Sequence, residues 1–492
     1  MLHDLKKLGK QTVIYGVGDI LGRLGAFLLL PIYTNYFTTD QYGALELLFM
    51  TASVLSLLLG KQLSSATLRF YFEYDSLEER NCVVSTSLLL YLVFSGALLG
   101  ICAFFAERFS YFIFSTSGYT THFIVTFVLL YFNLSEEILL SYVRAIDRAF
   151  LFVVVSVSGL IAKMLLCIYL VSFENWGILG VLVGNLVGSV IVWIMLSVFT
   201  FRRVGFSVDF RKFGEIAKYG LPLMAAGASG VVIGNLGRFF LNWYVSLSAV
   251  GIYALAMRLA SILRFLVVQP FGKAYGPFRF AVMKQADAKT IYARVATYFI
   301  GVCIWVIVGM IGLSGEVLQI MAKENYWAAR AVIPILLVSN LLGSGVYYMF
   351  QIGVYLQRKT KALSWLFAGA AMLDIGLMLV LVPRFGVYGA ASSQVVAHGV
   401  VAFMGLYLSQ RVYPIKYEWS RLLKIAALGM IASLALYSGY HVNPYLSAAI
   451  KLPIILLFPF SLFLVGFFDS GELAQFRGIW GRLRAQTAVA RE

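Results

Sequence analysis

The chain has 492 residues, of which 61% are hydrophobic and only 13% are charged, and its mean hydropathy is +0.85. A soluble globular protein carries about twice that charged fraction, so the composition excludes a soluble fold. The net charge of +16 does not indicate nucleic-acid binding, because the basic residues gather in the loops on one side of the predicted membrane spans.

Long apolar stretches recur along the chain, each close to the ~20 residues that cross a hydrocarbon core about 30 Å thick. Backbone groups in lipid must hydrogen-bond internally, so each stretch is predicted to be a helix. The first stretch lacks a signal-peptide cleavage pattern and is interpreted as an uncleaved span. The predicted spans are 11–34, 41–66, 82–105, 122–143, 149–172, 177–201, 217–242, 249–273, 291–314, 330–357, 362–382, 387–410, 420–440 and 446–468. The predicted fold class is therefore all-α, a polytopic membrane protein with about fourteen transmembrane helices.

The distribution of lysine and arginine predicts the orientation of these spans. If the N-terminus is cytoplasmic, the inner segments hold 28 of the 39 Lys and Arg residues. The outer loops then hold only five, Arg108, Lys323, Arg330, Arg384 and Lys451. This excess predicts that both termini lie in the cytoplasm, beside anionic lipid. The tail from Glu472 to Glu492 is compatible with an interfacial helix and equally with disorder.

The cysteines and glycines indicate neither a disulfide framework nor a cofactor. Cys82, Cys102, Cys167 and Cys303 all fall within predicted spans, without paired spacing, so no disulfide or metal site is predicted. The glycines that begin with Gly16 in the first span do not form a nucleotide-binding loop, because no strand precedes them. No cofactor is predicted.

The two halves of the chain resemble each other. Trp176-Gly-Ile-Leu-Gly-Val-Leu-Val-Gly-Asn185 matches Phe385-Gly-Val-Tyr-Gly-Ala-Ala-Ser-Ser-Gln394 at an offset of 209 residues. Tyr15-Gly16 and Tyr42-Gly43 match Tyr219-Gly220 and Val250-Gly251 at offsets of 204 and 208. Six spans separate the copies, so the halves are predicted to share one orientation, as in parallel-repeat transporters.

The repeat predicts the domain organisation. Residues 1–201 are expected to form an N-terminal lobe and residues 217–410 a C-terminal lobe, joined by a cytoplasmic linker at 202–216. Residues 411–468 would add two further helices, and residues 469–492 a cytoplasmic tail. A cleft between two such lobes is the expected substrate site.

Charged side chains lie deep within the predicted spans. At 1.5 Å per residue, Arg23, Lys163, Arg258 and Asp374 lie between about 14 and 20 Å from the nearer end of their spans. A charge at that depth is costly and usually lines a polar path. The chain is therefore predicted to move a charged substrate through the membrane.

Deep arginine suits a substrate that carries phosphate, because the guanidinium fork pairs with phosphate oxygens and stays ionised when desolvated. Arg23, Lys163 and Arg258 are the first candidates for substrate binding. Arg264 is a further candidate, although on an ideal helix it faces away from Arg258. Both reach one cavity only if that helix kinks or the cavity wraps around it. Asp19 lies four residues before Arg23, and a local ion pair between them is an equally open interpretation.

Acidic side chains at depth are candidates for ion or proton coupling. Asp19, Glu46 and Asp374 are assigned this role. Glu136 and Glu137 lie at similar depth, but Arg144 follows two turns later, which favours neutralisation by a basic neighbour. Pairing of acids with bases is the alternative for the whole set.

Several other polar residues have two interpretations. Asn185 and Gln394 occupy matching repeat positions, where an amide either packs between helices or binds sugar hydroxyls. Arg69 either follows the positive-inside rule or guards the cytoplasmic mouth of the cleft. Lys61 and Arg238 lie near span ends, where long side chains reach the headgroups, and no role is assigned to them.

The residues described so far resemble those of a known family. Tyr15-Gly16 through Pro31-Ile-Tyr33 to Tyr42-Gly43, followed by Leu68-Arg-Phe-Tyr71, resembles the opening of bacterial polysaccharide and O-antigen flippases. The matching half is similar in Tyr219-Gly-Leu-Pro-Leu223, Val250-Gly-Ile-Tyr253, Met257-Arg258 and Phe385-Gly-Val-Tyr-Gly389. The likeness spans residues 11–410. Lys61 and Gln62 depart from it, because a more apolar stretch is expected there.

The resemblance implies membership of the multidrug, oligosaccharidyl-lipid and polysaccharide exporter superfamily. It implies a two-lobed bundle that opens alternately to each side and turns undecaprenyl-diphosphate-linked oligosaccharides across the bacterial cytoplasmic membrane, for polysaccharide or lipopolysaccharide biosynthesis. It also implies a cationic cleft for the diphosphate, which Arg23 and Arg258 would fit, and coupling to an ion or proton gradient rather than to ATP. The implied partners are the lipid-linked substrate, the membrane and polysaccharide assembly machinery. The oligomeric state stays open, and a monomer is compatible with the sequence.

Two other functions remain open from the sequence. A multidrug or cation antiporter of the same superfamily would bind a cation at Asp19 or Asp374, but deep arginine argues against cationic drugs. A membrane-embedded glycan polymerase or glycosyltransferase would need catalytic carboxylates in a sizeable outer loop, and the longest outer loops have only about 16 residues. Asp40 is the one candidate there, and it is better interpreted as the N-cap of span two. The sequence therefore predicts a transporter and not an enzyme.

Overall fold

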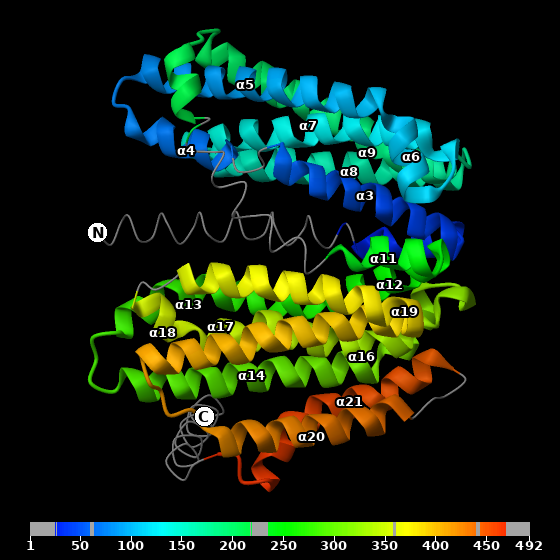
Figure 1. The fold of residues 1–492 in the computed structure, drawn as a ribbon, viewed down its shortest axis with the longest axis vertical. Coiled ribbons are helices and arrows are strands. Elements are labelled where there is room, and N and C mark those ends of the chain that lie inside the picture. Colours follow the sequence, from blue (N-terminus) through cyan, green and yellow to red (C-terminus); the bar gives the residue numbers. More distant parts are fainter. Residues whose placement is uncertain are drawn as a thin grey trace, which may run out of the picture. The chain divides into compact units, whose positions relative to one another are not determined.

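A computed structural model describes residues 25, 27–59, 63–216, 218, 235–357, 361–438 and 443–468. All regular secondary structure in these residues is helical (Figure 1), which confirms the predicted fold class. The chain divides into two compact units. Unit 1 comprises Met1–Leu255, Met321–Ala328 and Phe367–Gln394, and unit 2 comprises Ala256–Ile320, Ala329–Leu366 and Val395–Glu492.

Unit 1 is built mainly from the first half of the chain. In this unit α7 packs against α5 and α9, and α8 packs against α9, so apolar helices bury one another's sides. The helices are α2 (Leu30–Tyr36), α3 (Thr39–Leu58), α4 (Leu63–Glu73), α5 (Leu77–Phe104), α6 (Ala106–Phe114), η1 (Ser117–Tyr119), α7 (Thr120–Ala145), α8 (Ala149–Ser172), α9 (Gly177–Val204), α11 (Gly237–Tyr244) and η3 (Glu324–Tyr326).

Unit 2 contains most of the second half. Here α14 packs against both α20 and α21, so the two added C-terminal helices rest on it. The helices are η2 (Arg264–Val268), α13 (Gln269–Val282), α14 (Ala288–Gly312), α15 (Ser314–Met321), α16 (Ala329–Asn340), η4 (Leu341–Val346), α17 (Tyr347–Phe350), α18 (Ile352–Leu356), α20 (Trp419–Ser438) and α21 (Pro444–Leu464). Helices α12 (Leu247–Ala260) and α19 (Lys361–Val412) contribute to both units, as does α15 through its last residue, Met321.

Ten helical stretches among the described residues are long and apolar enough to cross a membrane. They coincide with every predicted span from 82–105 onward except 217–242, most of which lies outside the described residues. The predicted spans 362–382 and 387–410 fall in one stretch, Ala362–Val412. A non-helical residue, Gly386, divides it close to the predicted boundary.

The predicted second span, 41–66, is interrupted. Helix α3 ends at Leu58 and α4 begins at Leu63, and residues 60–62 between them lie outside the described residues. Thr38 caps α3: its side chain accepts a hydrogen bond from Gln41 N, and the Gln41 side chain accepts one from Thr38 N. The prediction that Asp40 is the N-cap is wrong, because Asp40 lies inside the first turn, where its charge complements the positive end of the helix dipole.

Glycines at equivalent repeat positions share an unusual backbone conformation. Gly177 and Gly386 have φ values of +57° and +53°, a region that glycine enters without a Cβ penalty. Three residues later, Gly180 and Gly389 lie close to the preceding helical segment. A Cβ would stand 3.2 Å from the Leu170 carbonyl carbon at Gly180 and 2.2 Å from the Leu381 carbonyl oxygen at Gly389. Both copies of the predicted repeat therefore use the same turn.

Two π-helices interrupt the longer helices of unit 2. One, η2, follows α12, the other, η4, follows α16, and the two contact each other. A π-helical turn is rare and often marks a functional position. The predicted span 249–273 is thus not one regular helix.

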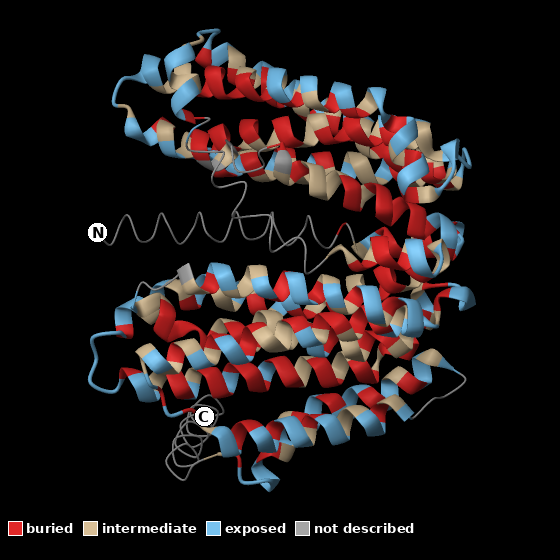
Figure 2. Cartoon of the chain, in the orientation of Figure 1, coloured by how far each residue is buried: buried red, intermediate tan, exposed pale blue. Residues whose placement is uncertain are grey.

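Many helices carry exposed residues, which are pale blue in Figure 2, and many of these exposed residues are large and apolar. Phe104, Phe150 and Trp365 are each about four-fifths exposed, at 82%, 79% and 80%. On helices of membrane-spanning length such side chains face lipid, because only a hydrocarbon surrounding makes this exposure favourable. The chain is a multi-pass membrane protein.

Candidate functional site

The predicted basic residue Lys163 pairs with an acid of its own repeat. Its Nζ donates a hydrogen bond to Glu136 Oε2 at 3.3 Å, which joins α8 to α7, and both side chains are largely buried. Lys163 rather than Arg144 therefore neutralises Glu136; the Arg144 guanidinium lies over the Phe152 ring. Asp19 and Arg23 lie outside the described residues.

Arg238 lies in a buried ion pair and not at the headgroups. Its side chain is 11% exposed, and its Nη2 lies 3.6 Å from Glu46 Oε2, whose side chain is 7% exposed. Nη1 contacts Met50 Sδ at 3.9 Å. Glu46 belongs to α3 in the first repeat and Arg238 to α11 in the second, so the pair joins the two copies. The sequence expectation for Arg238 is wrong, since the nearby buried carboxylate holds the guanidinium inside the protein.

Helices α3 and α12, which occupy matching repeat positions, cross in close backbone contact. A Cβ on Gly43 would stand 2.1 Å from Leu247 O, and a Cβ on Gly251 would stand 2.1 Å from Thr39 O. Ser248 Oγ donates to Thr39 Oγ1 at 2.7 Å beside this crossing. Glycine at both matching positions is what lets the two backbones approach.

We call this feature the inter-repeat seam. It consists of Thr39, Gly43 and Glu46 from α3, Arg238 from α11, and Ser248 and Gly251 from α12.

Further hydrogen bonds reinforce the seam within unit 1. Tyr326 OH lies 3.2 Å from Phe37 O and 2.9 Å from Thr38 O, both directly before α3, and donates to them. Asn242 of α11 donates to Ile113 O at the end of α6. Residues from the second half of the chain therefore hold the start of α3 and the end of α6.

Asp374 is buried in α19 without a hydrogen-bond partner. Among the described residues, neither carboxylate oxygen has one, and the residue is 1% exposed. The nearby Ser393 hydroxyl donates to Ala390 O at 2.9 Å and is close enough to the Asp374 carboxyl to donate to it instead if the hydroxyl turns. The buried Tyr253 of α12 interacts electrostatically with both Arg238 and Asp374. A buried carboxyl without hydrogen bonds is costly as a bare anion and suits a bound proton or cation.

The two arginines predicted in span 249–273 lie on either side of a helix interruption. Arg258 is half-buried near the end of α12, and Arg264 is exposed at the start of the π-helix η2. Between them Ser261 O accepts from both Arg264 N and Phe265 N, at 3.0 and 3.2 Å. The irregular helix that would let both arginines serve one cavity is therefore present, and a cavity that holds both stays a prediction.

His398 is a polar residue that the sequence analysis does not single out. Its Nδ1 lies 2.8 Å from Ser339 Oγ, and it interacts electrostatically with Arg264. Its ring packs on Gly343 of η4, where a Cβ would stand 2.5 Å from His398 Cδ2. Its position as a lone histidine inside the apolar span 387–410 could have marked it as a candidate from the sequence.

The other predicted residues in the described part of the chain are Arg69, Asn185 and Gln394. Arg69 pairs with Glu73 at 3.7 Å, and both side chains are more than half exposed, a geometry that contributes little to stability. Asn185 Nδ2 donates to Val181 O at 2.8 Å in its own helix and to Cys167 Sγ at 3.3 Å, which favours the helix-packing interpretation. Gln394 is 2% exposed in α19.

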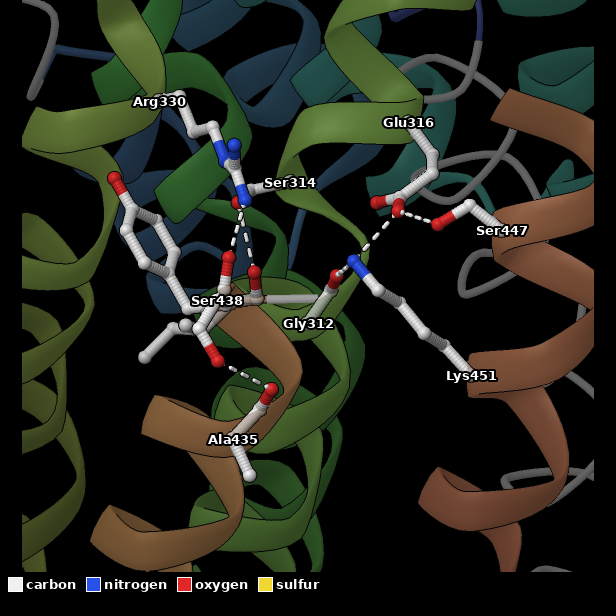
Figure 3. Close-up of polar contacts among 10 residues, drawn as sticks. Gly312, Ser314, Glu316, Arg330, Ala435, Ser438, Ser447 and Lys451 are labelled. Atoms are coloured by element: carbon white, nitrogen blue, oxygen red, sulfur yellow. Dashed lines mark hydrogen bonds and ion pairs between the residues drawn. The ribbon is translucent and has the colours of Figure 1, made fainter. Parts of the chain in front are cut away.

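A second buried ion pair attaches the last helix to unit 2 (Figure 3). Lys451 Nζ of α21 lies 2.6 Å from Glu316 Oε1 of α15 and also donates to Gly312 O at 3.0 Å. Ser447 Oγ donates to the same Glu316 oxygen at 2.5 Å. We call Gly312, Glu316, Ser447 and Lys451 the clamp. The outer-loop position predicted for Lys451 is wrong, because it lies in α21 and is 3% exposed.

The electrostatics of the clamp favour the ionised carboxylate. Burial alone would raise the pKa of Glu316, but hydrogen bonds from Lys451 and Ser447 outweigh it and hold that pKa below its usual range. Beside the clamp, Arg330 of α16 donates to Tyr437 O of α20 at 2.5 Å (Figure 3). Both added helices are thus held to unit 2 by a cation.

One cavity of unit 2 has an apolar lining and does not suit a charged group. It has a volume of about 460 Å³ in unit 2, and apolar side chains such as Ile307, Pro334 and Leu434 dominate its lining. In the part of the chain that the structure describes, no cluster of three or more His, Cys, Asp or Glu side chains is placed to hold a metal ion.

The Glu46–Arg238 pair of the seam could have been predicted from the sequence. Glu46 lies about 10 Å from the start of α3, and Arg238 about 9 Å from the end of α11. Opposite charges at equal depth, next to glycines that match in the repeat, would have predicted a pair between the two copies.

Comparison with known proteins gives a consistent family. Residues 8–283 match the family model described as "Polysaccharide biosynthesis protein". A protein of the Lsg locus of Haemophilus influenzae is 27% identical over 286 residues, which cover 57% of this chain and 67% of the relative. A membrane protein of the same organism is 21% identical over 397 residues, which cover 77% of this chain and 94% of the relative.

Solved structures show the same fold at low sequence identity. A structure of the lipid II flippase MurJ in an inward closed conformation aligns with a TM-score of 0.74 and 15% identity, and it covers 93% of this chain and 100% of that one. An inward-facing multidrug resistance MATE family transporter of the MOP superfamily aligns with a TM-score of 0.59 and 17% identity, covering 85% and 95% of the two chains. The chain therefore shares its fold with these two solved structures.

Proposed function

The chain belongs to the polysaccharide biosynthesis protein family, and on that premise we propose that it is a flippase. It turns an undecaprenyl-diphosphate-linked oligosaccharide from the cytoplasmic to the outer leaflet of the bacterial cytoplasmic membrane by alternating access, and it is a transporter rather than an enzyme. The observation that carries this proposal is the family match over residues 8–283. Support comes from the fold shared with a protein named a lipid II flippase. Both termini are proposed to be cytoplasmic.

Basic residues on the irregular part of α12–η2 are proposed to bind the diphosphate. Arg258 and Arg264 flank the interruption, and guanidinium groups pair with phosphate oxygens through two hydrogen bonds. The sequence adds Arg23 as a third proposed ligand. Lys163 is a fourth, and its charge is partly neutralised by Glu136. Gln394 is proposed as a ligand of the sugar hydroxyls and Arg69 as a guard of the cytoplasmic mouth. Asn185 is a weaker candidate for the sugar hydroxyls, because its amide already bonds within α9 and to Cys167.

Asp374 is the proposed site of ion or proton coupling. Its two buried oxygens have no hydrogen-bond partner among the described residues, so a proton or cation that enters would relieve the cost of a buried charge. Asp19 stays a second candidate for this role from the sequence. The contact of Glu46 with Arg238 supports a different role for Glu46, which is developed in the next subsection.

The decisive experiment is transport in proteoliposomes that contain a labelled undecaprenyl-diphosphate oligosaccharide. We expect leaflet exchange by the parent chain, and we expect R258A and R264A each to lower its initial rate about tenfold or more, because a charge-assisted contact to phosphate is lost. K323A removes one exposed positive charge elsewhere and should keep the parent rate. Failure of the parent chain to move any diphosphate-linked lipid would contradict the proposal.

A second candidate function is cation-coupled drug export. It is favoured by the fold shared with a MATE family multidrug transporter and by the buried carboxyl of Asp374. The same proteoliposomes separate the two functions when they are loaded with a cationic dye. Proton-driven dye efflux that D374N abolishes, without movement of lipid-linked glycan, would replace the flippase proposal with this one.

A further inference from the structure

We propose that the inter-repeat seam is the outer gate of the transport path and that Glu46 and Arg238 are positioning residues that hold this gate shut. The direction of the gate rests on the proposed function and the predicted orientation, in which α3 and α12 both begin at the outer side. The contacts that make up the seam are independent of the substrate.

The crossing of α3 and α12 needs an additional closing force. Gly43 and Gly251 allow close backbone approach but contribute no side chain, and in lipid the hydrophobic effect does not drive helices together. The hydroxyl contact of Ser248 with Thr39 adds one hydrogen bond. Glu46 follows Gly43 by three residues and therefore lies on the same face of α3, one turn further in. The Glu46–Arg238 pair is thus placed to pull the crossing together.

The geometry of the pair suits a contact that forms and breaks. Its charged atoms are 3.6 Å apart, longer than the 2.7–2.9 Å of a well-formed charge-assisted hydrogen bond. Arg238 Nε has no hydrogen-bond partner among the described residues, and Nη1 has only a sulfur contact at 3.9 Å. Separating such a pair gives up less than separating a fully hydrogen-bonded one.

Arg238 also lies within the reach of a second group in the same unit. Tyr253 interacts electrostatically with both Arg238 and Asp374. A change of charge at Asp374 therefore alters the field in which Arg238 holds Glu46.

The test measures closure of the seam directly. T39C and S248C are introduced into the full chain after Cys82, Cys102, Cys167 and Cys303 are replaced, because the native hydroxyls at 39 and 248 are 2.7 Å apart. Cross-linking by a short thiol reagent is then followed over time in membranes without substrate. We expect fast cross-linking in this parent, and about tenfold slower cross-linking with E46Q or R238Q, within the range of usual coupling energies.

Matched variants distinguish the effect of the Glu46–Arg238 pair from the effect of losing any buried charge. E136Q removes a buried acid of a pair that lies within one repeat and should leave the cross-linking rate unchanged. E46Q with R238Q should be no slower than either alone, because both remove one shared interaction. E46D keeps the charge and should fall between parent and E46Q, which covers the case in which a charge-free variant folds poorly. Cross-linking of E46Q at the parent rate would overturn the proposal.

A second readout links closure to turnover. With labelled lipid-linked glycan in proteoliposomes, the cross-linked parent should be inactive and should recover after reduction of a disulfide formed between the same positions. A cross-linked chain that transports at the parent rate would also overturn the gate. If the reduced parent moves no glycan, the proposed function fails instead. The cross-linking rates then still decide whether the Glu46–Arg238 pair holds the seam closed.

Discussion

The seam and the clamp each place one buried acid against one buried base, but they differ in how closely the two charges approach. In the clamp the charged atoms are 2.6 Å apart, Ser447 donates to the same Glu316 oxygen, and Lys451 also donates to Gly312 O, while Glu316 Oε2 has no hydrogen-bond partner among the described residues. In the seam the charged atoms are 3.6 Å apart, and one nitrogen of Arg238 meets a sulfur. The clamp fixes an added helix, whereas the seam joins the two repeats.

This difference indicates how one chain combines permanent and temporary joints. A buried pair with full hydrogen bonding is strongly destabilising to break, because removal of one partner leaves the other charge buried. A pair whose charged atoms lie farther apart has less interaction energy to lose when it separates. The contact chemistry therefore distinguishes a joint that must last from one that must open, although both are buried acid–base pairs.

The largest expected effect comes from breaking the clamp. K451M leaves the Glu316 carboxylate buried without its cation, and we expect a loss of about 3–5 kcal/mol in stability. Thermal unfolding in detergent would measure this as a lower Tm. K424M, which removes an exposed lysine of α20 that donates to Gly466 O, is the control. A K451M chain as stable as K424M would remove the contrast between the two joints.

The next effect comes from the glycine crossing. G43A or G251A would place a Cβ 2.1 Å from a backbone oxygen, so the helices must move apart at a cost of about 1–3 kcal/mol. We expect a lower Tm and loss of cross-linking between positions 39 and 248. G376A, whose Cβ would meet nothing within 4 Å, should leave both unchanged. Normal cross-linking in G43A would mean that the backbones need not touch.

A smaller effect is expected when both charges of the seam are removed. E46Q together with R238M leaves no unpaired ion, so stability should change by no more than about 1 kcal/mol. The seam should nevertheless cross-link more slowly, because its closing force is lost. Unfolding and cross-linking measured on one preparation would show this separation. A Tm loss equal to that of K451M would show that the seam pair stabilises the fold as strongly as the clamp does.

The smallest effect is the pH dependence of the clamp. The folded pKa of Glu316 lies below its ordinary value of 4.5, so its stabilising contribution is fully present above that value and is lost as pH falls through the folded pKa. The Tm advantage of the parent chain over E316Q should be constant near pH 7 and shrink below about pH 4. An advantage that grows on acidification would reverse the assigned sign.

Much of the fold follows from hydropathy, because membrane-spanning helices must satisfy their own backbone. The sequence predicts α5, α7, α8 and α9 to within a few residues in most cases, and it places the break of α19 near Gly386. It fails where a local contact decides. Thr38 rather than Asp40 caps α3 because of its reciprocal bond with Gln41, and a π-helix such as η2 has no signature in hydrophobicity.

The candidate site was predictable in part. Hydropathy and depth single out Lys163, Glu46 and Asp374 as buried charges, and the structure buries all three largely or fully. Depth does not say which acid meets which base, because partners come from helices far apart in the chain. Arg238 and Lys451 were therefore misplaced: each lies near a span end by sequence, and a buried carboxylate from another helix draws it inward.

The glycine crossing of α3 and α12 has a consequence for how such proteins diversify. The contact between Gly43 and Gly251 is made by main-chain atoms, so it holds no information about the cargo. Residues that bind the substrate can then change without altering the backbone contact between α3 and α12. A crossing made by main-chain atoms can therefore be kept in related proteins whose substrate-binding side chains differ.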